Sequence, residues 1–164
     1  MTAEVNGLNE KLIHLLIEKG LKISTAESCT GGLLSALLTD VSGASEVLEE
    51  CIVTYSNEVK ERELGVKHET LEKHGAVSRE TAEAMAIGAR GIFGTDYAVS
   101  VTGLAGPEGD GSDTPVGTVF ISLACEDGVF TRSLNIGTFR ARLRTMAANH
   151  ALDMLRRHMT GLKI

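Results

Sequence analysis

The sequence is poor in the residues that bind nucleic acid. It has no tryptophan, two tyrosines and four phenylalanines among 164 residues. Its formal charge is −6 at pH 7, whereas a non-specific grip on nucleic acid depends mainly on lysine and arginine side chains that neutralise phosphates. Aromatic rings for base stacking are scarce as well, so a nucleic-acid partner is not expected.

Cysteine is also scarce. Cys29, Cys51 and Cys125 cannot all pair within one chain, and none belongs to a C-x-x-C motif or a Cys/His cluster with zinc-ligand spacing. We therefore expect neither a disulfide framework nor a metal site. No apolar run is long enough to cross a bilayer, and residues 1–9 lack the features of a secretory signal. These absences predict a cytoplasmic protein that does not bind membranes.

Alternating strand and helix patterns predict one domain over residues 1–164, a length that can bury a core. Leucines at helical spacing from Leu8 onward stop at Gly20 and predict an N-terminal helix. The expected strands are 22–26, a buried strand 47–55, 97–101, and a hairpin of 116–124 with 128–136; the other expected helices are 32–39, 69–74, 140–158 and two that begin near 56 and 78. This order predicts an α/β fold with three α/β/α layers and a mixed, mostly parallel sheet.

The segment Thr25 to Gly32, T-A-E-S-C-T-G-G, lies where a predicted strand passes into a helix. The first N–H groups of a helix have no intrahelical partner, so this turn can hold a phosphate or a developing oxyanion. Ser28 is the leading nucleophile there. Cys29 is a rival, because a thiolate is favoured at a helix N-terminus. Glu27 either binds a ligand or caps the same N–H groups.

A serine nucleophile needs a base beside it. None of the five histidines falls near a strand end, so a Ser-His-Asp arrangement has no support. Ser56, Asn57 and Lys60 share one face of a predicted helix that follows the second strand. If the two strands end on the same side of the sheet, a desolvated Lys60 can take the serine proton. On spacing alone, however, a solvated surface lysine is the simpler interpretation.

The loop Thr102 to Pro107, T-G-L-A-G-P, is a second candidate region. Loops at strand ends along one edge of an α/β sheet commonly bind ligands, and glycine lets a backbone approach them closely. The loop matches neither G-x-G-x-x-G nor the phosphate-binding P-loop. Arg140 and Arg144, four residues apart on the last predicted helix, could together hold a phosphate, although such arginines are ordinarily surface residues.

Five blocks occur in the order found in the CinA C-terminal domain family, the nicotinamide mononucleotide deamidases, which the chain resembles from about Leu8 to its final helix. The blocks are T-A-E-S-C-T-G-G from Thr25, V-T-Y-S-N-E-V-K from Val53, H-G-A-V-S from His74, V-T-G-L-A-G-P from Val101 and P-V-G-T-V from Pro115. The resemblance implies a serine amidohydrolase of pyridine nucleotide salvage. Such an enzyme converts nicotinamide mononucleotide and water to nicotinate mononucleotide and ammonia, with no metal and no cofactor. Larger members have an additional N-terminal domain, and we expect this chain to be the stand-alone form.

By the same resemblance, Ser28 is the nucleophile, Lys60 is the general base, and Tyr55 orients the lysine or contacts the substrate. The expected substrate contacts are Thr30, Gly31 and Gly32 as oxyanion or phosphate donors, with Asn57, Thr102, Gly103, Gly106, Arg140 and Arg144. Where family members have G-D-R, this chain has G-T-F-R at 137–140, with one residue more and no aspartate. Which arginine binds the phosphate therefore stays open.

Two further questions stay open at this stage. The alternative function is a nucleotide-sensing protein that binds a phosphorylated ligand without turnover, linked to competence or DNA damage as the family name suggests. Apolar positions on the terminal helices are compatible with a homo-oligomer or with a core. Ser28 together with Lys60 favours the enzyme.

Overall fold

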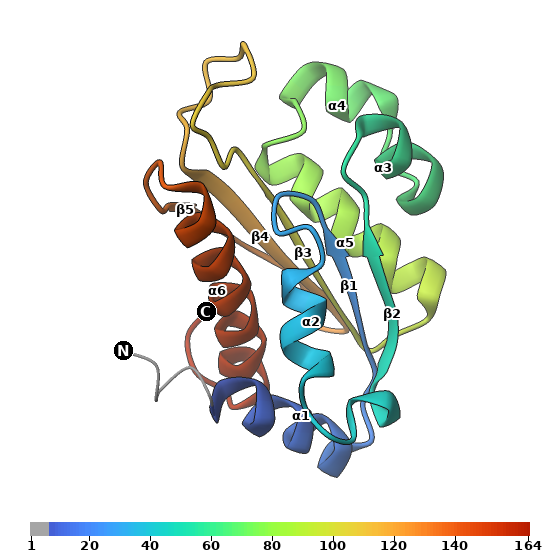
Figure 1. Ribbon diagram of the computed structural model, residues 1–164. Coiled ribbons are helices and arrows are strands. Elements are labelled where there is room, and N and C mark those ends of the chain that lie inside the picture. Colours follow the sequence, from blue (N-terminus) through green and yellow to red (C-terminus); the bar gives the residue numbers. More distant parts are fainter. Residues whose placement is uncertain (1–6) are drawn as a thin grey trace.

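The computed structural model describes residues 7–164 (Figure 1). Residues 1–6, part of the segment used to predict the absence of a secretory signal, lie outside this range. Five strands form one sheet in the order β2-β1-β3-β4-β5. The strands are β1 (Ile23–Glu27), β2 (Leu48–Val53), β3 (Tyr97–Gly103), β4 (Thr118–Cys125) and β5 (Gly128–Asn135). β1 pairs in parallel with β2 and β3, and β4 runs antiparallel to both of its neighbours, so the sheet is mixed.

Helices cover both faces of this sheet. They are α1 (Leu8–Lys19), α2 (Leu33–Thr39), α3 (Asn57–Leu64), α4 (His68–His74), α5 (Arg79–Phe93) and α6 (Arg140–Met159), with a short 3-10 turn, η2 (Ala44–Glu46). α1, α2 and α6 lie on one face and α3, α4 and α5 on the other (Figure 1). The expected three-layer α/β/α fold is therefore confirmed. Within residues 7–164, no helix combines the length and the apolar character needed to cross a membrane.

Local chemistry sets the ends of the helices. α1 ends at Gly20, whose φ of 65° lies in the left-handed region that glycine adopts most easily. The hydroxyl oxygens of Ser56 and Ser78 accept hydrogen bonds from the N–H groups of Val59 and Thr81, which caps α3 and α5. These signals are local, so the sequence predicted the corresponding boundaries to within a residue or two.

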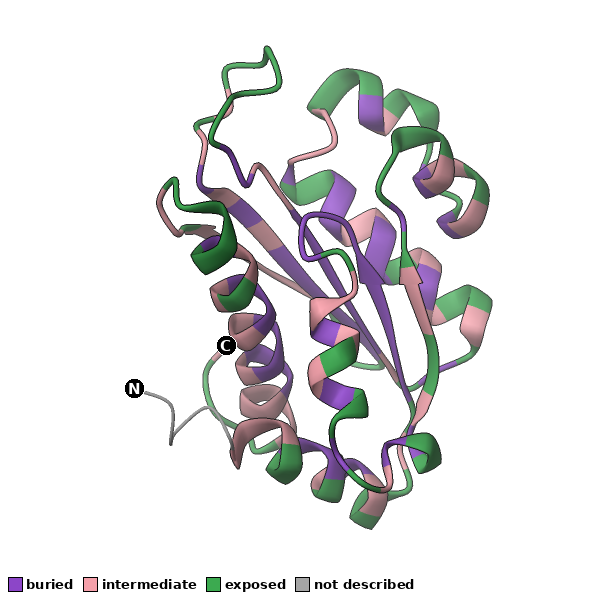
Figure 2. Cartoon of the chain, viewed as in Figure 1, coloured by how far each residue is buried: buried purple, intermediate pink, exposed green. Residues whose placement is uncertain are grey.

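Each face of the sheet has its own core, and the buried residues in Figure 2 follow this division. The larger core packs α1, α2 and α6 against the sheet, with residues such as Leu12, Ile121 and Leu152. In the smaller core, α3 and α5 touch through their backbones. A Cβ at Gly88 would collide with the carbonyl oxygen of Leu64, so α5 needs glycine there to let α3 pack closely on it.

The expectation of a buried strand at 47–55 is wrong. The strand ends at Val53 and lies at the edge of the sheet, where each of its residues is intermediate or exposed, and Val53 is 43% exposed. Its apolar content resembles that of a central strand because one side still packs on neighbouring elements. β1, whose five residues are all buried, lies between β2 and β3 and carries the candidate site at its end (Figure 2).

Candidate active site

Ser28 and Lys60 meet at the carboxyl end of β1. Ser28 is the first residue after this strand, and its N–H donates to the carbonyl of Val101 in β3 at 2.9 Å. Lys60 lies in the first turns of α3, and its Nζ is 3.2 Å from Ser28 Oγ. Its side chain is fully buried, so the solvated-lysine interpretation is wrong. The structure thus brings together the two groups that a Ser/Lys mechanism requires.

Lys60 is held by neutral oxygen atoms. Its Nζ donates to the carbonyl oxygens of Thr54 at 2.7 Å and Tyr55 at 3.3 Å, and no carboxylate contacts it in the described part of the chain. Burial without a counter-ion disfavours the charged amine and lowers the pKa of Lys60 to about 8. A neutral amine has two hydrogens for the two carbonyls, which leaves its lone pair for the proton of Ser28.

Cys29, the rival nucleophile, is only 5% exposed. Burial raises the pKa of its thiol to about 11, with a smaller contribution from the charge of Glu27. At neutral pH the thiol therefore stays protonated, and the helix N-terminus does not produce a reactive thiolate. Of the two candidates, Ser28 alone has a base in contact with it.

Glu27 accepts hydrogen bonds from most of the free N–H groups at the N-terminus of α2. Its fully buried carboxylate accepts hydrogen bonds from the N–H groups of Gly32, Leu34 and Ser35 and from the hydroxyl of Ser35. The N–H of Gly31 donates to the carbonyl of Ser28. The expectation that Gly31 and Gly32 donate to an oxyanion or a phosphate is therefore wrong, because a buried carboxylate and a turn already use these groups.

The N–H groups of Cys29 and Thr30 remain available as donors to an oxyanion. Within residues 7–164, neither donates a hydrogen bond to another residue. The N–H of the residue that follows a nucleophilic serine is a common oxyanion donor. Cys29 borders the cavity next to Ser28, whereas Thr30 does not, so the backbone of Cys29 is the better-placed donor.

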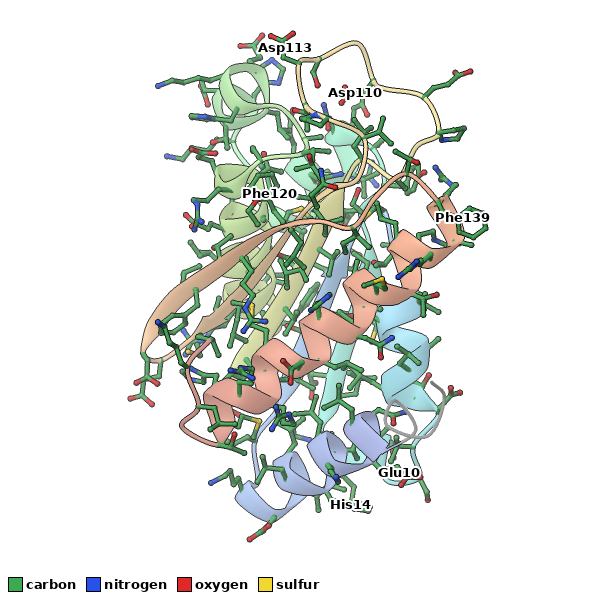
Figure 3. The ribbon with its side chains drawn as sticks, turned by 90° about the vertical axis from the view of Figure 1, so that its left-hand side faces the viewer. Glu10, His14, Asp110, Asp113, Phe120 and Phe139 are labelled. Atoms are coloured by element: carbon green, nitrogen blue, oxygen red, sulfur yellow. The ribbon has the colours of Figure 1, made fainter. Side chains whose placement is uncertain are left out.

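A cavity of about 270 Å³ opens beside Ser28 and Lys60. Its other lining residues are Cys29, Tyr55, Ala76, Val77, Thr102, Gly103, Leu104, Ala105, Gly106, Glu108, Asp110 and Arg140. In Figure 3, the loop with Asp110 and the start of α6 with Phe139 lie at the same end of the molecule, away from Glu10 and His14 of α1. The volume is near the lower limit of small-molecule sites, about 300 Å³.

The loop after β3 forms one wall, as expected for Thr102, Gly103 and Gly106. The Thr102 hydroxyl donates to the carbonyl of Ala76 and so fixes the loop against the segment before α5. Gly103 must be glycine, because a Cβ there would lie 2.9 Å from the carbonyl oxygen of Thr118. Gly106 has a φ of 77°, in the left-handed region. The backbone of this wall can therefore approach a ligand closely.

The two arginines have different positions. Arg140 lines the cavity, and its guanidinium donates to the carbonyl of Gly106 at 2.9 Å and to the Tyr55 hydroxyl at 3.2 Å. Arg144 instead donates to the carbonyls of Cys29 and Thr30, behind the nucleophile turn. Arg144 therefore braces the turn, and Arg140 is the arginine that can reach a ligand.

Tyr55 lines the cavity and its backbone carbonyl contacts Lys60, in keeping with its expected place, whereas Asn57 does not line the cavity. Tyr55 is 62% exposed and its hydroxyl contacts Arg140, whereas only its backbone carbonyl touches Lys60. Asn57 is exposed and does not line the cavity, so its expected substrate contact is not supported. It starts α3 one residue after the Ser56 cap, and the helix turns its side chain to the outside.

Sequence reasoning missed four lining residues. Ala76 and Val77 belong to the H-G-A-V-S block, to which no role was assigned, and Glu108 and Asp110 follow directly after the T-G-L-A-G-P loop. The Ser112 hydroxyl and N–H donate to Asp110 and lower the pKa of its carboxyl group. The cavity thus has one cationic wall and one anionic wall.

These features define an α/β protein with a buried Ser–Lys pair at the carboxyl end of a central strand, beside a small cavity. The family model of the CinA C-terminal domain matches residues 5–159, and the chain belongs to this family.

Several known proteins are similar to this chain in sequence and structure. A CinA-like protein of Shewanella pealeana is 48% identical over 155 residues, which are 94% of this chain and 37% of that protein. The chain spans little more than a third of the length of the curated relatives it matches. The structure of the competence/damage inducible protein CihA from Agrobacterium tumefaciens is 40% identical, with a TM-score of 0.90 and 95% of each chain covered. That of a competence or damage-inducible protein from Enterobacter asburiae is 35% identical, with a TM-score of 0.91, and covers 94% of this chain and 98% of that chain.

Proposed function

We propose that the protein is a nicotinamide mononucleotide amidohydrolase that works through Ser28 and Lys60. The observation that carries the proposal is the 3.2 Å contact between a nearly buried serine hydroxyl and a fully buried amine without a counter-ion. A lysine of pKa about 8 is neutral in roughly one molecule in ten at pH 7, about 300-fold more often than a lysine of ordinary pKa. Family membership supports the same reaction class.

The first half of the reaction breaks the amide bond. Ser28 Oγ attacks the carboxamide carbon while its proton passes to the neutral amine of Lys60. The N–H of Cys29 faces the developing oxyanion, and a donor of this kind contributes about 3 to 4 kcal/mol to catalysis. When the tetrahedral intermediate collapses, the Lys60 ammonium returns the proton to the leaving nitrogen. Ammonia departs and leaves an ester between Ser28 and the nicotinoyl group.

The second half regenerates the enzyme. A water molecule attacks the ester carbonyl and gives a proton to Lys60, which passes it to Ser28 Oγ as the ester bond breaks. Nicotinate mononucleotide leaves. The same base serves both halves, so the scheme requires neither a metal nor a cofactor.

The charges around the cavity suit a mononucleotide. Nicotinamide mononucleotide has a cationic ring and an anionic phosphate. Arg140 has donors for phosphate oxygens. Glu108 and Asp110 offer carboxylates to the ring charge or to ribose hydroxyls. Thr102, Gly103 and Gly106 present a close backbone wall.

Ammonia release from nicotinamide mononucleotide tests the proposal. We expect wild-type protein to release one ammonia per nicotinate mononucleotide formed. Ser28→Ala should lose turnover but still bind the nucleotide, since it removes the attacking atom and little contact surface. Ser42→Ala, an exposed serine remote from the site, is the matched control and should keep full activity. Tight binding without ammonia from wild-type protein would instead support the non-catalytic sensor.

A further inference from the structure

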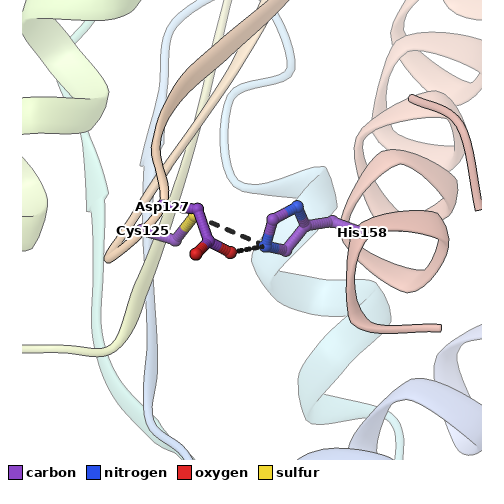
Figure 4. Close-up of side chains that lie close together, drawn as sticks. All are labelled: Cys125, Asp127 and His158. Carbon is purple, nitrogen blue, oxygen red and sulfur yellow. Dashed lines mark hydrogen bonds and ion pairs between the residues drawn. The ribbon is translucent and has the colours of Figure 1, made fainter. Parts of the chain in front are cut away.

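A second group of reactive side chains lies at the opposite end of the sheet from Ser28. Cys125 is the last residue of β4, Asp127 lies in the turn to β5, and His158 lies near the end of α6 (Figure 4). Cys125 is next to Ala124, which pairs with Ala98 at the start of β3, whereas Ser28 follows the carboxyl end of neighbouring β1. The group is thus independent of the proposed active site.

Three different donor atoms converge there. Nε2 of His158 lies 3.5 Å from Sγ of Cys125 and 3.2 Å from Oδ2 of Asp127, and all three ligand atoms lie within 4.8 Å of one another. Tetrahedral zinc with ordinary bond lengths separates a sulfur from a nitrogen ligand by about 3.5 Å, and a nitrogen from an oxygen ligand by about 3.4 Å. Two of the three distances therefore already fit a shared ion.

The surroundings fix two of the ligands. The ring of His158 packs edge-on to Tyr97, with centroids 5.8 Å apart, and at a tilt on Phe130, with centroids 5.2 Å apart. Cys125 is 6% exposed. Asp127, with a side chain 71% exposed, lies in the turn and has room to adjust. A preformed pair with one adjustable carboxylate is suited to capture an ion from solvent.

Nε2 of His158 faces both the sulfur and the carboxylate, and it can direct one hydrogen at only one of them. Among the described residues, the thiol donates one further hydrogen bond, to the carbonyl of Gly128 at 3.7 Å. A cation between the three atoms would bind all of them at once. Thiolate and imidazole ligands favour zinc over magnesium or calcium, which prefer oxygen ligands.

We infer that Cys125, Asp127 and His158 bind one zinc ion, with solvent as the fourth ligand, and that this ion ties the β4–β5 turn to the end of α6. This departs from the sequence expectation of no metal site. Two of the ligands are two residues apart, but the third follows only after 30 further residues, so no metal-ligand motif is visible in the sequence.

Metal titration of the full-length, metal-free protein tests the inference. Zinc is titrated against a chromophoric chelator, and Co²⁺ in place of zinc reports a cysteine ligand by its thiolate charge-transfer absorption. We expect one ion per chain, the thiolate absorption, and an upward shift of the thermal midpoint that magnesium does not produce. Cys125→Ser, Asp127→Asn and His158→Gln should each weaken zinc binding at least tenfold. Cys51→Ser and His14→Gln, outside the group, should leave binding unchanged.

The wild-type spectrum tests the inference even where a variant fails to fold. Absence of the thiolate absorption at saturating Co²⁺ would overturn the site, as would zinc affinity that is unchanged in a folded Cys125→Ser protein. No saturable zinc binding would leave only an ion pair of His158 with Asp127 and would overturn it too. Amidase activity enters none of these readouts, so the outcome is independent of the proposed function.

Discussion

Replacing Lys60 with methionine should inactivate the protein and stabilise it. Burial lowers the pKa of this amine from 10.5 to about 8, and each pKa unit corresponds to 1.36 kcal/mol, so the charged form costs the folded state about 3 kcal/mol at pH 7. Methionine has a similar shape and no charge. It also lacks the hydrogen bonds to Thr54 and Tyr55, a loss of about 1 to 2 kcal/mol. The net expectation is a gain of about 1 to 2 kcal/mol in the free energy of unfolding.

The stability gain of Lys60→Met should decrease as the pH rises. Below pH 8 both the folded and the unfolded wild-type chains hold the Lys60 proton, and the full cost of the buried cation is present. Between pH 8 and 10.5 only the unfolded chain holds the proton, so wild-type stability rises with pH. Lys60→Met lacks this titration. The stability advantage of the variant should therefore be largest below pH 8 and shrink as the pH approaches 10.5.

Urea unfolding of both proteins from pH 6.5 to 10 measures this difference, and titrations common to both proteins cancel. Lys73→Met replaces an exposed lysine at the end of α4 and is the matched control, with an expected change within about 0.5 kcal/mol at every pH. A Lys60→Met protein less stable than wild type by about 2 kcal/mol at pH 7, or a difference that does not vary with pH, would refute the reasoning about the buried amine.

Four further outcomes are expected. The kcat/KM of wild-type protein should rise with pH through an apparent pKa near 8, as Lys60 becomes neutral, and a flat profile from pH 6 to 9 would contradict its role as base. Arg140→Gln should raise KM for the mononucleotide at least tenfold without affecting hydrolysis of the nucleoside that lacks the phosphate. Equal effects on both substrates would show that Arg140 does not contact the phosphate. Arg144→Gln should lower kcat and stability instead, because it releases the carbonyls behind Ser28; a change confined to KM would argue against this. Glu27→Gln should destabilise the protein by about 2 kcal/mol in urea unfolding, and an unchanged midpoint would show that its helix contacts matter little.

Short stretches of sequence predict much of the fold. Gly20 ends a helix, and Ser56 and Ser78 begin helices, through contacts with neighbours three or four residues away. Such signals can be recognised without tertiary structure. The burial of β2 could not be predicted in this way, since a strand's place at the edge or the centre depends on which strands pair with it.

The candidate site likewise has a part that local sequence predicts and a part that depends on tertiary packing. Ser28 at a strand-to-helix turn was visible in the sequence, but the burial of Lys60 depends on α3 packing against α5, through contacts such as Leu64 with Gly88. From the residues alone, a solvent-exposed Lys60 was as compatible with the sequence as a buried one. The family resemblance reversed that interpretation before the structure did, because it relates positions that local patterns cannot connect.

Two buried charges of opposite sign near the nucleophile stay apart, and this separation is what makes a base possible. A carboxylate beside Lys60 would favour the ammonium and raise its pKa, which would remove the neutral amine that Ser28 needs. Glu27 is nearby but its oxygens accept hydrogen bonds from the first turn of α2, while the amine faces only carbonyls and a hydroxyl. The helix N-terminus, which the sequence suggested as the anion site for the substrate, binds an anion of the protein itself. The hydrogen bonds of this terminus thus go to the Glu27 carboxylate, and under the proposed mechanism the N–H of Cys29 stabilises the substrate's oxyanion instead.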